Sequence, residues 1–452
     1  MQPRNPQRRA PTSRALNRKG FLKLGGSALA GTALLGLAGC GGGGESGSEV
    51  TEFTFSFGPD SSGSLQRLVD RFNQKFQGKY KANYRVMAAD TGQYFNQLKT
   101  EFQAGGGETD LIGGDVIWPI QFAANGWIED LSDRFTVEER AKFLPAPVQS
   151  CTYDDKVYGV PWFTDAGMLY YREDLLERSG FSEPPKTWSE LKEQTRKVVQ
   201  DSGMEDGFVF QGARYEGGVV NGLEYIWTSG GDVIDPEDPE KVVIDEPGAV
   251  EGLAIERSMV ESGVAPKAVS TYAEQECQAA FLNGRAVFCR NWPYMYALAT
   301  GEGESRLEPG QVGVAPLPVA EDHGESFSGL GGWNFYLNAA SSEEEKEAAY
   351  EFVEFATAPE QQKFRALNGS FLPTLQSLYD DQEILEKVPV IALGKEAIKN
   401  ARPRPLSPYY SDMSLEMAEQ FNASLKGAKS PEEAIRTLDR ELQEIVDLGE
   451  IS

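Results

Sequence analysis

Aromatic residues stand among turn formers and polar groups in four segments of this sequence, which read DVIWPI, VPWFTDAG, RNWPYMY and GLGGWNF. Flat rings of this kind can stack on the C–H faces of a sugar, while carboxylates and guanidinium groups satisfy its hydroxyls. A single tryptophan is more often a core residue than a ligand platform. Because four such segments occur together, they predict a sugar site, in which the glycines before Trp333 leave room for a pyranose ring.

The chain has few residues that could perform covalent catalysis. The single histidine, His323, lies in AEDHGES, where we expect an exposed loop residue. Serine–histidine and cysteine–histidine catalysis would both need this residue, and a zinc site with several histidines is impossible. Paired carboxylates for glycoside hydrolysis stay open as an alternative, because 69 acidic residues always offer pairs.

Two further segments have the composition of a ligand loop but not its order of residues. QAGGGETDLIGGD lacks the lysine and the hydroxyl residue of a phosphate-binding loop. GGDVIDPEDPEKVVIDE lacks the ligand order of a calcium-binding EF-hand and is better explained as an acidic surface turn. The sequence therefore predicts no metal and no cofactor.

The charge of the chain excludes several classes of partner. The formal net charge is −26 over 452 residues. Residues 1–39 carry seven Lys/Arg and no acid, so the remainder has 36 basic and 69 acidic residues and a charge of −33. Such a surface does not attract nucleic acid or anionic lipid, because both need a basic field. We expect the acidic excess to lie on a solubilising surface.

The beginning of the chain has the pattern of an export leader. NRKGFLKLGGSALAGTALLGLAGC combines a basic n-region, an apolar h-region too short for a membrane span, and a small-residue cleavage site. Its end, LAGC, resembles a bacterial lipobox, and NRKGFLK is similar to a twin-arginine signal in which Lys19 replaces the second arginine. We predict a signal peptide at 1–39 and an acylated Cys40 with a flexible tether at 40–50, on an exported protein anchored by lipid to the outer face of the membrane.

Alternating strand and helix patterns follow the leader. TEFTFSF places Phe53, Phe55 and Phe57 at a period of two, whereas LQRLVDRFNQKF has apolar residues at helical spacing. YRVMAAD and DLIGGDVIW are typical of further strands, around the helical GQYFNQLKTEF. This order predicts an α/β fold with a largely parallel sheet, and it puts Asp90–Thr91 and Asp115–Trp118 at the rim where ligands bind.

Later helices are predicted by their caps. TWSE and SPEE both fit a capping box, and the second has a proline at the first helical position. The C-terminal helix that follows SPEE carries Ile435, Leu438, Leu442 and Ile445 on one face. This face is expected to pack on the body of the protein.

The length of the chain favours two lobes or more. YGVPWFTDAG and VGVAPLP are the candidate strands that cross between the lobes. Once Cys40 is acylated, Cys151, Cys277 and Cys289 remain, so one thiol stays unpaired within a monomer. Two alternatives are open: a Cys277–Cys289 disulfide, because both lie between the crossing strands and hence in one lobe, or three free thiols.

The order of segments from about residue 51 onward carries a resemblance to a known family. These segments are DVIWPIQFAANGWIEDLSDRF, DAGMLYYREDLLERSGFSEPPKTWSEL, FVFQGARYEG, RNWPYMYAL, VGVAPLP, LGGWNF and RPRPLSPYY. The chain resembles the family 1 extracellular solute-binding proteins, which are the receptors of ABC sugar importers. Within this family it is most similar to the trehalose/maltose-binding proteins.

The resemblance implies a two-lobe periplasmic-binding-protein fold of type II, like that of maltose-binding protein. Two α/β lobes would close on the ligand about a hinge and perform no chemistry. Lobe 1 is predicted to comprise 51–163 and 317–374, and lobe 2 to comprise 164–316 and 375–452. A monomer is expected.

Matching motifs imply a ligand site with three kinds of residue. Polar residues come from ADTGQ, DVIW and TDAG, stacking aromatics come from NWPY and GGW, and further contacts come from FQGARY and RPRP. Asp165 would sit at the hinge, and Arg404 would reach sugar hydroxyls. In chain order the implied residues are Thr91, Asp115, Asp165, Gln211, Tyr215, Trp292, Tyr294, Gly332, Trp333 and Arg404.

The loop after the first strand departs from the family pattern. The family often has an acidic ligand there, whereas this chain reads FGPDSSGSL. Asp60 or one of the serines is the candidate replacement, so the choice of trehalose over maltose or another glucoside stays open.

The function implied is delivery of an α-linked glucose disaccharide to the permease subunits of an ABC importer. One alternative is an anchored glycoside hydrolase. The other keeps the binding role for an oligosaccharide, a glycosylated osmolyte or a polyol.

Overall fold

The computed structural model describes residues 50–235, 238–301, 303, 305–321 and 324–451. The predicted signal peptide, Cys40, most of the tether and His323 lie outside the described residues. Within the described part of the chain, no helix is both long enough and apolar enough to cross a membrane.

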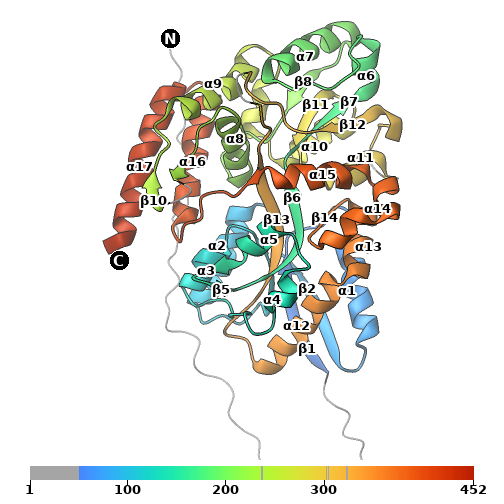
Figure 1. Cartoon of the computed structure of the whole chain (residues 1–452), viewed down its shortest axis with the longest axis vertical. Helices are drawn as coiled ribbons and strands as arrows, with labels where there is room; N and C mark the ends of the chain where they lie inside the picture. The colour runs from blue at the N-terminus through green and yellow to red at the C-terminus, as the bar shows by residue number, and fades with distance from the viewer. Residues whose placement is uncertain (1–49, 236–237, 302, 304, 322–323, 452) are drawn as a thin grey trace, which may run out of the picture. The chain divides into compact units, whose positions relative to one another are not determined.

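A first sheet forms where the alternating phenylalanines were predicted to make a strand. Its strand order is β14-β6-β13-β3-β1-β2, and β15 pairs with the beginning of β13 (Figure 1). The strands are β1 (Thr51–Phe57), β2 (Tyr80–Val86), β3 (Leu111–Asp115), β6 (Val160–Ala166), β13 (Ser328–Leu337), β14 (Leu372–Pro373) and β15 (Ala401–Arg402).

The first sheet is mixed rather than largely parallel. β1 pairs in parallel with β2 and β3, as predicted, but β13 runs antiparallel to both β3 and β6, and β14 runs antiparallel to β6. The prediction of a largely parallel sheet was therefore wrong for half of this sheet. The chain leaves β6 for a second sheet and returns from that sheet to β13. The direction of these two strands is therefore independent of the parallel pairs that β1 forms with β2 and β3.

The second sheet follows directly after β6. Its order is β12-β7-β11-β8, in which β7 is antiparallel to β11 and β12 while β11 is parallel to β8. Its strands are β7 (Met168–Arg172), β8 (Asp206–Val209), β11 (Ala286–Asn291) and β12 (Val312–Ala315). Two small hairpins accompany the sheets, β4 (Thr152–Tyr153) with β5 (Lys156–Val157) and β9 (Ile234–Asp235) with β10 (Asp238–Val242).

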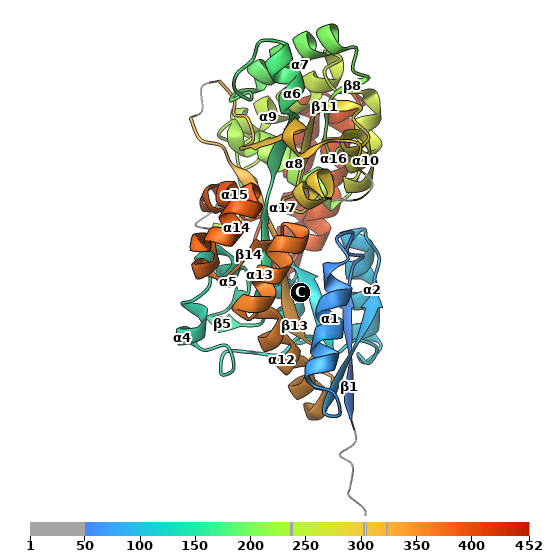
Figure 2. The same ribbon diagram turned by 90° about the vertical axis from the view of Figure 1, so that its right-hand side faces the viewer.

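Helices whose apolar side chains recur at helical spacing pack on the first sheet. α1 packs on β2, α12 on β1, and α15 on β6 and β13. Figure 2 shows α13, α14 and α15 side by side, in agreement with their contacts. The helices of this part are α1 (Ser64–Lys75), α2 (Thr91–Gln103), α3 (Pro119–Ala124), α4 (Val137–Arg140), α5 (Pro145–Ser150), α12 (Glu343–Thr357), α13 (Pro359–Gly369), α14 (Gln382–Lys387) and α15 (Pro389–Lys399).

Other helices surround the second sheet or pack beside it. α7 and α10 contact β8 and β11, while α8, α9, α16 and α17 pack on one another. These helices are α6 (Glu173–Arg178), α7 (Trp188–Ser202), α8 (Glu216–Thr228), α9 (Pro247–Glu261), α10 (Glu274–Leu282), α11 (Met295–Thr300), α16 (Tyr410–Leu425) and α17 (Pro431–Ile451).

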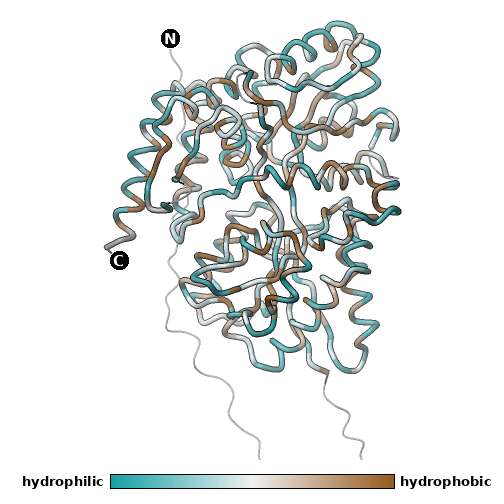
Figure 3. The backbone as a smooth tube through the Cα atoms, viewed as in Figure 1, coloured by the Kyte–Doolittle hydropathy of each residue, from teal (hydrophilic) through white to brown (hydrophobic). Residues whose placement is uncertain are grey.

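The predicted helix starts are confirmed. Thr187 and Glu190 form a reciprocal capping box at the start of α7, and Ser430 Oγ accepts from the Glu433 N–H at the start of α17. Hydrophobic residues recur among hydrophilic ones along α17 (Figure 3). Ile435, of the predicted face, is buried in the cluster that α17 forms with α8, α9 and α16.

One core residue of α9 is a carboxylic acid. Glu256 is 2% exposed, and its Oε2 has no hydrogen-bond partner among the described residues. The hydroxyl of Tyr225, on the neighbouring helix α8, is also buried without a partner there. Burial raises the pKa of Glu256 to about 8, because a carboxylate is poorly solvated in the core.

We predict that Glu256 makes the protein less stable as the pH rises. The folded state holds this proton more tightly than the unfolded state, whose carboxyl titrates near 4.5, so the stability is fully present below pH 4.5 and is lost as the pH passes about 8. The loss is at most about 1.4 kcal/mol per pH unit in that window. Glu256→Gln should flatten the dependence in denaturant titrations at pH 5 and pH 8.5. Glu251→Gln, at an exposed position of the same helix, is the control and should change nothing; equal slopes for all three proteins would contradict the prediction.

Candidate ligand-binding site

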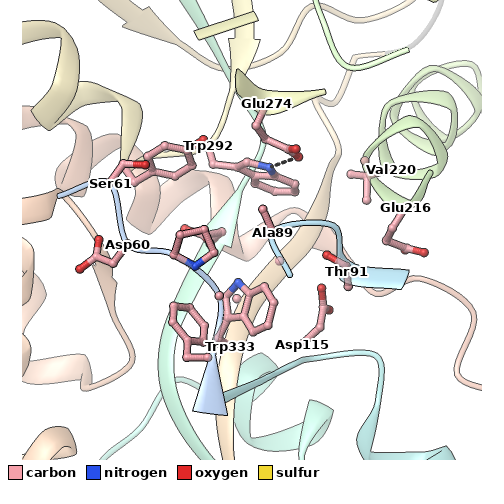
Figure 4. Close-up of a pocket in the computed structure, with 18 of the residues that line it drawn as sticks. Asp60, Ser61, Ala89, Thr91, Asp115, Glu216, Val220, Glu274, Trp292 and Trp333 are labelled. Atoms are coloured by element: carbon pink, nitrogen blue, oxygen red, sulfur yellow. Dashed lines mark hydrogen bonds between the residues drawn. The ribbon is translucent and has the colours of Figure 1, made fainter. Parts of the chain in front are cut away.

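A cavity lies at the predicted rim of the first sheet, opposite α8, α10 and the turn after β11 (Figure 4). It contains about 1160 Å³ of empty space, open solvent included. Nine of the ten residues that the sequence implied as ligands line it: Thr91, Asp115, Asp165, Tyr215, Trp292, Tyr294, Gly332, Trp333 and Arg404. The chain therefore brings these distant motifs to one place.

The two tryptophans of the cavity come from different sheets. Trp333 belongs to β13 of the first sheet, and Trp292 directly follows β11 of the second (Figure 4). The Trp333 ring has edge contacts with Phe57 at 4.9 Å and with Trp118 at 5.8 Å between ring centroids. Both tryptophans are partly exposed, so each ring is fixed by the protein on some sides and open to the cavity on another.

The glycines before Trp333 make room for neighbouring protein groups. A Cβ on Gly331 would lie 3.0 Å from the Trp292 ring and 3.1 Å from the Cβ of Asp165. Gly332 has a φ of +125°, and a Cβ there would lie 2.6 Å from the carbonyl oxygen of Phe163. Both glycines also line the cavity, so the prediction that they clear space for a pyranose stays a prediction. They let Trp292 and β6 approach β13 closely, which shapes the cavity indirectly.

A buried arginine joins two carboxylates at the cavity. Arg404 donates from Nη2 to Asp115 Oδ1 at 2.8 Å and from Nη1 to Glu216 Oε1 at 2.7 Å. Burial raises the pKa of Asp115 and Glu216 adds to the rise, while Arg404 opposes both. Burial alone would lower the pKa of Arg404, but the two carboxylates hold it above its usual range. Both terminal nitrogens of Arg404 are thus occupied by protein groups.

Asp165 has an unused acceptor. It is buried at the end of β6, lines the cavity, and its Oδ1 has no hydrogen-bond partner within the described residues. Burial raises its pKa well above the ordinary value, and the Asp115 carboxylate adds to this rise. An unpaired buried oxygen costs free energy, which a ligand hydroxyl would recover.

Two acidic residues at the cavity were missed by sequence reasoning. Glu274 accepts from the Tyr215 hydroxyl at 2.8 Å and from Trp292 Nε1 at 3.5 Å (Figure 4). Glu216 follows Tyr215 directly and begins α8. The adjacency of Glu216 to a named motif was a usable signal, but nothing in the sequence around Glu274 distinguishes it from other residues that begin a helix.

Asp60 lines the cavity, but the protein itself uses its carboxylate. It accepts from the Leu65 N–H at 2.6 Å and from Arg365 Nη1 at 3.0 Å, so it caps α1 and pairs with a buried arginine. Burial would raise the pKa of Asp60, but Arg365 and the surrounding donors hold it below the usual value. Ser61, the next residue, also lines the cavity and is the better candidate to replace an acidic ligand.

Gln211 is the one implied ligand that does not line the cavity. It is fully buried, donates to the Arg290 carbonyl at 3.0 Å and accepts from Asn221 Nδ2 at 3.0 Å. The structure corrects its placement, because its amide is taken up by protein groups behind Trp292.

The cysteines and acids suggest no further chemistry. Cys151, Cys277 and Cys289 are buried free thiols in this structure, and Cys289 Sγ lies 3.8 Å from the carbonyl oxygen of Cys277. The Cys277–Cys289 pairing stays a prediction. The described residues contain no group of three or more His, Cys, Asp or Glu side chains that could hold a metal ion.

Comparison with known proteins identifies the family. The profile described as bacterial extracellular solute-binding protein matches residues 58–363, which is more than half of the chain. The chain is a bacterial extracellular solute-binding protein. It is exported, and it is a binding protein rather than an enzyme, so the alternative of a glycoside hydrolase is set aside.

Similar proteins support this assignment. A probable ABC transporter-binding protein of Deinococcus radiodurans is 36% identical over 350 residues, which cover 76% of this chain and 81% of that relative. A maltotriose-binding protein of Pyrococcus abyssi is 29% identical over 316 residues, or 69% of this chain and 64% of that one. The solved structure of maltose-bound MalE3 from T. maritima aligns with a TM-score of 0.83 and 38% identity, covering 87% of this chain and all of that one. The predicted two-lobe solute-binding fold is confirmed.

We predict that Arg404→Met destabilises this solute-binding protein strongly at neutral pH. It leaves Asp115 and Glu216 buried without their cation, which typically costs about 3–5 kcal/mol. The cost should shrink at pH 5, because burial raises the pKa of Asp115 and its stranded carboxylate can then take up a proton. Thermal melts at pH 5 and pH 8 measure this. Arg440→Met removes an exposed partner of Glu441 and should leave both melting temperatures nearly unchanged; the same small effect from Arg404→Met would refute the bridging role.

Proposed function

We propose that this protein binds an α-linked glucose disaccharide, of the trehalose or maltose type, and delivers it to the permease subunits of an ABC importer. The observation that carries the proposal is the pair Trp292 and Trp333, which face one cavity from two different sheets. Two rings that meet when the sheets approach can hold the C–H faces of two linked sugar rings. Two of the relatives named above bind maltose or maltotriose by their descriptions, and they support the same ligand class.

The polar groups of the cavity suit hydroxyls rather than a charged ligand head. Among the described residues, Asp165 Oδ1 has no partner, and Glu274 accepts from Tyr215 and, at 3.5 Å, from Trp292. The Arg404 cation is already neutralised by two carboxylates, so it does not form an anion site. A neutral, hydroxyl-rich ligand fits this charge balance best.

We infer the lobe boundaries from strand pairing. β6 stays in the first sheet through Ala166, and β7 begins the second at Met168, so the first crossing is at Gly167 rather than at 163/164. Val319 donates to the carbonyl of Lys186 and Ala320 to that of Thr228, so this stretch still contacts the segments around α7 and α8. We therefore place the second crossing between Ala320 and β13 rather than at 316/317. α14 and α15 contact α13, β6 and β13. We therefore place the third crossing after β15, near residue 402, rather than at 374/375.

Isothermal titration with a sugar panel tests the proposal. Trehalose, maltose, maltotriose, a glycosylated osmolyte and a polyol are titrated into the purified protein, and the sugar is recovered afterwards. We expect the tightest binding for an α-linked glucose disaccharide, which is recovered uncleaved. Preference for the trisaccharide, the osmolyte or the polyol would reassign the ligand, and binding of none would reject the proposal.

A tryptophan variant tests the stacking role within the same experiment. Trp333→Ala should weaken sugar binding by about 30- to 700-fold, because a buried aromatic anchor typically contributes about 2–4 kcal/mol. Trp127→Ala is the matched control, since Trp127 is also half-buried and packs on Phe102 and Phe122 but does not line the cavity. Sugar affinity within about threefold of wild type in Trp333→Ala would remove Trp333 from the site.

The lipid anchor is a separate part of the proposal. Acylation of Cys40 would hold the protein at the outer face of the membrane, and Gly41 to Glu49 would act as the tether. We expect Cys40→Ala to leave the protein soluble or retained as an unprocessed precursor, as judged by fractionation and intact mass. Mature protein that stays on the membrane in this variant would contradict the anchor.

A further inference from the structure

A buried ion pair joins α8 to β11 beside the ligand cavity. Glu224 and Arg290 are each 2% exposed. Arg290 Nε donates to Glu224 Oε2 at 2.8 Å, and Arg290 Nη2 donates to Glu224 Oε1, so the pair is bidentate. A buried pair of this kind seldom adds net stability over an apolar pair of the same volume, but it fixes geometry closely. Its contacts on both sides show which geometry it fixes.

On one side the pair contacts both strands that pass between the sheets. Glu224 Oε1 accepts from the Gly329 N–H of β13 at 3.0 Å. A Cβ on Gly167, the residue between β6 and β7, would lie 2.2 Å from Glu224 Oε1 and 2.4 Å from Arg290 Nη2. The pair therefore fills the space between the two crossing points, and only glycine allows it to come so close.

On the other side the pair supports the ring of Trp292. The guanidinium carbon of Arg290 lies 4.0 Å from the centroid of this ring, in cation–π geometry. Gln211 holds the arginine in place, because it accepts from Arg290 Nη1 at 3.3 Å and donates to the Arg290 carbonyl. A planar guanidinium can stack flat on the ring while it binds a carboxylate through two parallel N–H donors, a geometry that a lysine ammonium cannot reproduce.

We propose that Glu224 and Arg290 are positioning residues that couple Trp292 to the crossing strands at Gly167 and Gly329. The inference rests on the proposed sugar-binding function, in which Trp292 stacks on the ligand. A sugar on Trp292 favours one orientation of the ring. Through the stacked guanidinium and its carboxylate, this orientation favours one arrangement of the crossing strands. Ligand stacking and movement at the crossing strands are then parts of one equilibrium.

The test compares variants that keep the fold but break the connection. Arg290→Lys retains the charge and loses the stacked, bidentate geometry. The double variant E224L/R290M removes both charges together, so no buried ion is left unpaired. Arg172→Lys is the matched control, because Arg172 is also buried and bidentate with Asp174 but lies at the end of β7 that is far from Gly167.

Two quantities are measured for each protein with the sugar that wild type binds best. Calorimetry gives the affinity, and small-angle scattering at saturating sugar gives the change in radius of gyration on binding. We expect Arg290→Lys and E224L/R290M to bind at least about tenfold more weakly and to compact less than wild type when saturated. Arg172→Lys should match wild type in both. A purely structural role for the pair would instead lower melting temperatures and leave affinity and compaction intact.

The outcomes separate this inference from the proposed function. The coupling alone is overturned if wild type binds sugar and both variants keep an affinity within about threefold of wild type and compact fully. Absence of sugar binding in wild type overturns both. If E224L/R290M fails to fold, Arg290→Lys decides. Gly167→Ala then serves as the second variant, because its Cβ would displace the pair while both charges remain.

Discussion

The bridge from Asp115 through Arg404 to Glu216 is the interaction on which the arrangement of this site depends. Asp115 ends β3 of the first sheet, and Glu216 begins α8. Arg404 follows β15, the last strand of that sheet in chain order. Two buried carboxylates repel each other and lose their hydration, so a cation between them stabilises both in their ionised form. Arg404 supplies that cation, and its two ion pairs join three segments that are distant along the chain.

Small residues hold the large rings around this bridge. Gly331 and Gly332 let β13 approach Trp292 and β6, and Gly114 leaves a gap that the rings of Trp118 and Tyr336 fill, at 2.9 Å and 2.5 Å from where its Cβ would be. Such tight contacts leave the rings few alternative positions. The cavity of this solute-binding protein therefore combines closely packed aromatic walls with an acceptor, Asp165 Oδ1, that has no hydrogen-bond partner among the described residues.

Two buried ionic groups lie where the chain crosses between the sheets. The Glu224–Arg290 pair contacts Gly167 and Gly329, and Arg404 also approaches the carbonyl of Leu330 in β13. Apolar packing would stabilise these crossings equally well, but it tolerates many arrangements. Hydrogen-bonded ions accept only a few, so they fix the arrangement of the crossing strands closely.

The sequence by itself determined the elements whose signals are local. Phe53, Phe55 and Phe57 predict β1 because side chains alternate along a strand, and Thr187 predicts the start of α7 because a cap needs only its own helix. The matching motifs also implied ten ligand residues, and nine of these line the cavity. Only the tertiary structure decided that β13 runs antiparallel to β3, that Glu274 rather than Gln211 lines the cavity, and that Gly331 lets Trp292 approach. Each of these depends on which group from a distant part of the chain lies within about 3 Å. Spacing along the sequence does not encode that distance.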